Sequence, residues 1–99
     1  QLKFTVILEP EGDGTFAVHC PALPGCVSQG NDREEALKNI LEAIALVLEV
    51  MKEKGTAVPV ESREIIVEEI RAILSARDDD GLPPTLETAQ VELPSEVAV

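Results

Sequence analysis

The most constraining feature of this sequence is a long apolar stripe at helical spacing in the middle of the chain. Its large apolar residues recur three or four positions apart and so share one face of a helix: Leu37, Ile40, Leu41, Ile44, Val47, Leu48 and Met51. Asp32 precedes the stripe as a capping residue, and Glu35 follows three positions later in a capping-box arrangement. Because Gly55 provides a stop signal, the sequence predicts a helix from about residue 33 to about residue 53.

This stripe is wider than one ordinary helix face. The residues that widen it are Ala36, Ala43, Leu46 and Val50. One interpretation is a helix lying on a sheet, with its remaining apolar surface covered by the C-terminal segment. The other is an apolar edge used for self-association into a dimer or tetramer. We favour the first interpretation and keep the second.

Period-two alternation of apolar and polar residues predicts strands on both sides of this helix. It is seen over residues 2–9, 15–20 and 88–93. Two glycines and an aspartate in the 10–14 segment predict a hairpin between the first two strands. Prolines within 21–25 interrupt the second strand, because proline lacks a donor for the ladder, and a short third strand is predicted over 26–29.

A second helix is predicted over about residues 63–77, where Ser62 can cap the first turn. Apolar residues lie on one side of it, and these are Ile66, Ile70, Ile73 and Leu74. The predicted order is therefore strand, strand, strand, helix, helix, strand. We expect a two-layer α+β fold, in which one long helix and one extra helix pack on the same face of an antiparallel three-stranded meander plus a C-terminal strand. The length predicts a single domain over residues 1–99.

The charge balance restricts the kind of partner. Nineteen acidic residues against eight basic ones give a formal net charge of −11. A nucleic-acid binder needs a basic surface to displace counterions from phosphates, so direct nucleic-acid binding by this chain is disfavoured. A basic protein partner is favoured, because opposite fields steer association. Solubility is the alternative explanation for this charge.

No membrane segment is expected. The longest apolar stretch, residues 40–51, is interrupted by two glutamates and is too short to span a bilayer. The N-terminus lacks the charged and apolar regions of a secretory leader. Two cysteines are too few for a secreted disulfide scaffold, so we expect a cytoplasmic protein.

Three residues were candidates for chemistry, namely His19, Cys20 and Cys26. Zinc requires four ligands, and His19 and Cys20 point to opposite strand faces, so a metal site is disfavoured. A disulfide between the two cysteines is geometrically possible but disfavoured in a cytoplasmic setting. Nuclease chemistry needs carboxylates that converge on metal ions, whereas the inward strand faces carry aliphatic residues. No glycine motif fits a phosphate-binding loop. We therefore expect neither an enzyme nor a cofactor.

The segment from His19 to Gly30 and the helix start after it resemble the HicB antitoxin family, of the UPF0150 type. So does the opening segment from Phe4 to Pro10, and the resemblance extends over about residues 2–55. The family pattern is carried by a proline-rich Leu-Pro-Gly-Cys loop, a short strand ending in glycine and a Glu-Ala helix start. The residues that match it are Cys20, Pro21, Leu23, Pro24, Gly25, Cys26, Ser28, Gly30, Glu35 and Ala36.

The resemblance implies a partial ribonuclease-H-like fold without nuclease activity. It also implies an antitoxin role, in which the chain neutralises HicA, a small basic toxin that cleaves messenger RNA. The alternative is an orphan homo-oligomeric HicB-like protein that has no toxin partner.

Many members of that family carry a C-terminal DNA-binding segment. Here residues 61–81 form a helical insertion before the last strand, and we expect no separate DNA-binding domain. On electrostatic grounds alone, five acidic residues are expected to contact a basic toxin. These are Glu9, Glu11, Asp13, Glu64 and Glu68.

Overall fold

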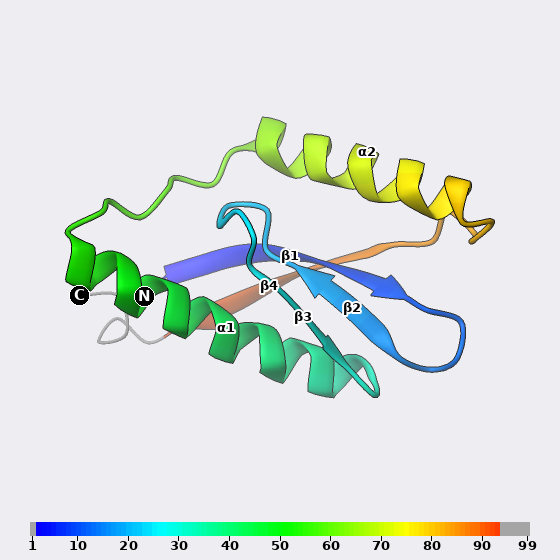
Figure 1. Ribbon diagram of the computed structural model, residues 1–99, viewed down its shortest axis with the longest axis horizontal. Helices are drawn as coiled ribbons and strands as arrows, with labels where there is room; N and C mark the ends of the chain where they lie inside the picture. The colour runs from blue at the N-terminus through cyan, green and yellow to red at the C-terminus, as the bar shows by residue number, and fades with distance from the viewer. Residues whose placement is uncertain (1, 94–99) are drawn as a thin grey trace.

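The chain forms a four-stranded antiparallel sheet with a helix on each side (Figure 1). The computed structural model describes residues 2–93. Its elements are β1 (Leu2–Pro10), β2 (Phe16–His19), β3 (Val27–Gly30), α1 (Arg33–Lys54), α2 (Arg63–Asp79) and β4 (Glu87–Leu93). The predicted α+β class and element order are confirmed, and element bounds differ from the predicted ones by one or two residues.

β1 is the strand that organises the sheet, whose order is β3-β2-β1-β4. The first three strands form the predicted meander, with Leu8 of β1 opposite Val18 of β2. β4 pairs along the other edge of β1, from Leu2 opposite Leu93 to Leu8 opposite Glu87. The first and last strands are therefore neighbours, with β1 inside the sheet and β4 at its edge.

The caps of α1 follow the predicted chemistry. Asp32 Oδ1 accepts the backbone N–H of Glu35 at 2.8 Å, and Glu35 Oε1 accepts the N–H of Asn31 at 2.8 Å. The first bond satisfies a donor that a helix start leaves free, and the second ties the residue before the cap to the first turn of the helix. At the other end, Gly55 adopts a left-handed φ of 69° and donates to the carbonyl of Lys52.

One face of α1 packs on the even-numbered face of β1. The buried residues of α1 are Ala36, Ile40, Ile44 and Leu48. They share a core with Phe4, Val6 and Leu8 of β1. Each fully buried aliphatic side chain contributes roughly 1.5–3 kcal/mol, so this layer is the main source of stability.

α2 lies on the opposite face of the sheet, which corrects the expectation that both helices share one face (Figure 1). Ile7 of β1 is fully buried, although it points away from α1. Its neighbours on that face contact α2 and the segment just before it. Thr5 donates its hydroxyl to Glu61, and Glu9 pairs with Arg77. Because α1 already covers the even-numbered residues, Ile7 can be buried only by an element on the other side.

This arrangement leaves part of α1 exposed. Leu46 is 64% exposed and Val50 is 45% exposed. α2 does not cover them, so the expectation that the C-terminal segment does so fails for the residues that the structure describes. The last predicted stretch, residues 94–99, lies outside the described residues.

Gly30 marks the closest approach between α1 and the sheet. A Cβ atom added at this position would lie 2.2 Å from the backbone nitrogen of Ala36. Because the obstructing atom belongs to a helix backbone, no side-chain rotation can relieve the contact. The first turn of α1 therefore packs directly on the end of β3.

Both cysteines belong to the core. Cys20 and Cys26 are buried free thiols. Burial raises the pKa of Cys20 to about 12, and the neighbouring Cys26 adds to this effect. Burial also raises the pKa of Cys26. Both side chains therefore stay protonated at neutral pH and behave as small apolar groups.

Replacing Gly30 with alanine should destabilise the protein. The added methyl group must displace the α1 backbone, and overpacking of this kind costs about 2–3 kcal/mol in the free energy of unfolding. Urea denaturation of G30A followed by circular dichroism measures this loss. Ser28→Ala on the same strand serves as the control, with a change within about 1 kcal/mol. Equal stability of G30A and the unmodified protein would contradict the packing described.

The two thiols should resist modification in the folded protein. Thiolate is the reactive form, and the raised pKa values of Cys20 and Cys26 keep both protonated at pH 8. With a chromogenic disulfide reagent at pH 8, we expect negligible reaction of the native protein. Both cysteines should react rapidly once the protein is unfolded in urea. Rapid labelling of either thiol in the native state would show that the core is open there.

Candidate partner-binding surface

Four of the five acidic residues predicted to bind a partner occupy two separate places. Glu11 and Asp13 are exposed in the turn between β1 and β2. Glu64 and Glu68 are exposed on α2. The structure therefore does not gather the predicted acids into one patch.

Asp13 has an additional local role within its turn. Its Oδ1 accepts the backbone N–H of Thr15 at 3.0 Å and also the Thr15 hydroxyl. These hydrogen bonds lower the pKa of Asp13, so the carboxylate stays ionised well below neutral pH. Part of its hydrogen-bonding capacity is used inside the turn.

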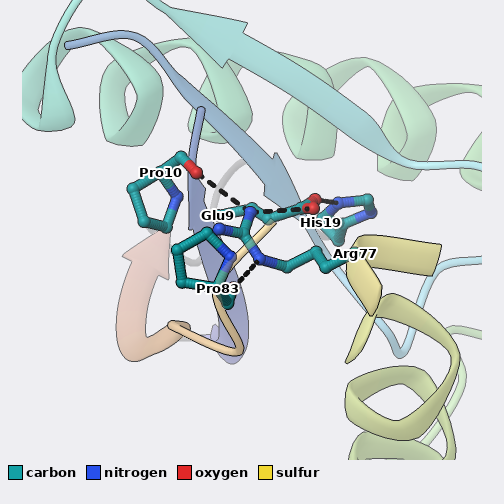
Figure 2. A network of polar contacts seen from close by, with 5 residues as sticks. All are labelled: Glu9, Pro10, His19, Arg77 and Pro83. Carbon is teal, nitrogen blue, oxygen red and sulfur yellow. Dashed lines mark hydrogen bonds and ion pairs between the residues drawn. The ribbon is translucent and has the colours of Figure 1, made fainter. Parts of the chain in front are cut away.

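Glu9 differs from the other four acids because its carboxylate is part of an internal network (Figure 2). Its Oε1 accepts from Arg77 Nη1 at 3.2 Å, and its Oε2 lies 3.1 Å from His19 Nε2. The Glu9 side chain is only 15% exposed. We therefore leave Glu9 out of the candidate surface.

Arg77 is the centre of this network and is only 2% exposed. Besides Glu9, its guanidinium donates to the carbonyl of Pro83 at 2.7 Å and to that of Pro10 at 2.9 Å. The end of α2 is thereby joined to the end of β1 and to the segment that leads into β4. Removing one partner of a buried ion pair costs roughly 3–5 kcal/mol, because the other charge is left without compensation.

The network joins Arg77, Glu9 and His19 by side-chain contacts. His19 is half-buried, with Glu9 as its partner. Within residues 2–93, no group of three or more histidine, cysteine, aspartate or glutamate residues could hold a metal ion.

Sequence reasoning missed this network, although a signal was present. Arg77 follows Ile73 by four positions and Ile70 by seven, so it continues the apolar side of α2. An arginine on a face that packs inward must find an anion there. Glu9 shares a strand face with Ile7, whose burial shows that this face is covered.

The proline-rich motif forms a tight loop between β2 and β3 that rises toward α2 (Figure 1). Backbone bonds close it: Cys20 and Leu23 donate to the carbonyls of Cys26 and Cys20, and Cys26 donates to that of Leu23. Leu23 is 1% exposed and anchors the loop in the core. Pro24 and Gly25 are exposed at the tip, where Gly25 adopts a φ of 80°.

The remaining motif residues serve the fold rather than the surface. Gly30 allows α1 to approach the sheet next to Ala36. Glu35 completes the α1 cap. Ser28 is half-buried on β3, and Pro21 is buried at the base of the loop. Of the motif, only the tip at Pro24 and Gly25 is freely exposed near α2.

Within the part of the chain that the structure describes, neither helix is long and apolar enough to cross a membrane.

Residues 4–75 match the family model described as "HicB_like antitoxin of bacterial toxin-antitoxin system". A UPF0150 protein of Thermoplasma acidophilum is 43% identical over 65 residues, which are 66% of this chain and 94% of that protein. A UPF0150 protein of Synechocystis is 48% identical over 59 residues, or 60% of this chain and 75% of that protein. Antitoxin HicB 1 of Photorhabdus laumondii is 34% identical over 58 residues, or 59% of this chain, and the match spans 37% of that protein.

Solved structures share the fold. The N-terminal domain of the Burkholderia pseudomallei antitoxin HicB superposes with a TM-score of 0.65 at 26% identity, covering 94% of this chain and 99% of that one. The chain in a structure titled "HicA3 and HicB3 toxin-antitoxin complex" superposes with a TM-score of 0.59 at 19% identity, covering 92% and 96%. At that identity the second likeness concerns the fold alone. From the family match over most of its length, this chain belongs to the HicB-like antitoxin family.

Proposed function

We propose that this protein is the antitoxin of a type II toxin–antitoxin pair and that it neutralises a small, basic HicA-type toxin that cleaves messenger RNA. The observation that carries the proposal is the family match over residues 4–75. The toxin–antitoxin complex that shares this fold supports it, because its title names a HicA protein as the partner of a HicB protein.

The charge of the chain supports the same role. An RNA-cleaving enzyme needs a basic surface for its substrate. A protein with a net charge of −11 is attracted to that surface, and opposite fields accelerate the encounter. Neutralisation of this kind requires no catalytic group in the antitoxin. It takes place in the cytoplasm, where the messenger RNA is.

Self-association is a second candidate property, and it would suit an orphan member without a toxin. The specific observation is the pair Leu46 and Val50, which are one turn apart and exposed on the outer side of α1. A second copy of the chain could bury both residues against their counterparts. In that case one face of α1 would pack on the sheet and the other would pack on the second copy of the chain.

Co-expression tests the antitoxin proposal. A HicA-type toxin encoded beside this gene should arrest growth when expressed alone, and this protein should restore growth. The two proteins should co-purify, and the complex should weaken as salt is raised, because screening reduces the attraction between opposite charges. Messenger RNA cleavage by the purified toxin, with and without this protein, supplies the direct measurement. Failure both to bind and to restore growth would contradict the proposal.

Light scattering coupled to size-exclusion chromatography tests self-association. The unmodified protein should elute at twice the mass of its 10.6 kDa chain. Leu46→Ser combined with Val50→Ser should return it to the monomer mass, because the apolar contact is lost. Val60→Ser is the matched control, since Val60 is 86% exposed and lies outside α1. A monomeric unmodified protein, or a dimeric double variant, would refute this contact.

A further inference from the structure

We propose that a basic segment of the toxin docks in a groove between α2 and the β2–β3 loop, and not on the acidic β1–β2 turn. This proposal rests on the antitoxin function proposed above. The groove is shallow, with a volume of about 420 Å³. It is lined by Pro21, Pro24 and Gly25 of the loop and by Ile65, Glu68 and Glu69 of α2. We call it the docking groove.

Both walls of the docking groove are held in place by contacts within the chain itself. The loop wall is closed by backbone bonds between Cys20 and Cys26 and is anchored by the buried Leu23. The α2 wall is held at one end by Glu61, which accepts from the backbone N–H of Thr5 at 2.6 Å. Arg77 holds the other end. A preformed surface loses little conformational entropy on binding, which favours affinity.

The apolar and acidic residues of the docking groove match a basic side chain. Ile65 is 37% exposed and provides an apolar contact beside the exposed Pro24 and Gly25. Within residues 2–93, neither Glu68 nor Glu69 takes part in an ion pair. A lysine or arginine side chain matches both features, because its aliphatic stem packs on apolar surface while its charged end meets a carboxylate. The groove therefore fits a basic segment of a folded protein.

The recess beside the β1–β2 turn is the rival site and is less suitable. It is lined mainly by polar residues, and several of these already have partners. Glu35 accepts from the N–H of Asn31, and Asn39 donates to the carbonyl of Gln29 at 2.7 Å. Asp13, in the adjoining turn, is bonded to Thr15. A partner would have to compete with these bonds.

Charge reversal in the docking groove provides the first test. Glu68→Lys with Glu69→Lys should weaken binding to the purified HicA-type toxin at least about tenfold by isothermal titration calorimetry, because the carboxylates meet the toxin's cations directly. Glu42→Lys with Glu49→Lys is the matched control, since both glutamates are exposed on α1 and the net charge changes equally. That control alters only long-range attraction, so we expect a change of less than about threefold. Circular dichroism verifies that both variants are folded.

A charge-neutral variant provides the second test. Ala72 also lines the groove and is exposed, and Ala72→Gln would partly fill it without changing the charge or helix propensity greatly. We expect A72Q to weaken toxin binding while its thermal unfolding stays unchanged.

The outcomes separate the two proposals. If the unmodified protein fails to bind the toxin, the antitoxin function is wrong and the docking proposal falls with it. If the unmodified protein binds, but the groove variants bind equally well, only the docking proposal is overturned. It is also overturned if Glu11→Lys with Asp13→Lys abolishes binding while the Glu68 and Glu69 variant does not.

Discussion

The buried guanidinium of Arg77 holds the end of α2 against the sheet. Arg77 is almost fully buried and makes hydrogen bonds to Glu9, Pro10 and Pro83. Taking a guanidinium out of water costs free energy. The hydrogen bonds to these three acceptors offset that cost. The contacts fix the end of α2 over the far side of the sheet. The acids of α2 and one wall of the docking groove lie on the helix that these contacts position.

Local patterns predicted most of the fold, because the responsible forces act between near neighbours. The helix bounded by Asp32 and Gly55 was evident from its caps and stripe, and the strands from their alternation. The side of the sheet occupied by α2 was not evident. An apolar helix face shows that something is buried, but it does not show against which surface. The pairing of β4 with β1 was equally hidden, since strand neighbours distant in sequence leave no periodic signal.

The candidate site was harder to predict than the fold. Charge alone identified Glu64 and Glu68, which are exposed on α2 as an electrostatic argument requires. The same reasoning included Glu9, because composition cannot distinguish a solvated carboxylate from one that pairs with a buried arginine. It did not single out Glu69 and Ile65, which line the proposed docking groove, since that groove is created by the approach of the β2–β3 loop to α2. Only the three-dimensional arrangement shows that Pro24 and Gly25 of the motif lie on the same surface as the acids of α2.

The central place of β1 has a consequence for the order of folding. Leu2 pairs with Leu93, so the free edge of β1 is covered only after the chain has passed through both helices. A nascent chain on the ribosome can form the β1–β2–β3 meander and cover it with α1 from local contacts. It must nevertheless expose the outer edge of β1 until β4 is synthesised, and an unpaired edge strand invites association with other chains. The pairing of β4 therefore closes an edge that would otherwise be open to association with other chains.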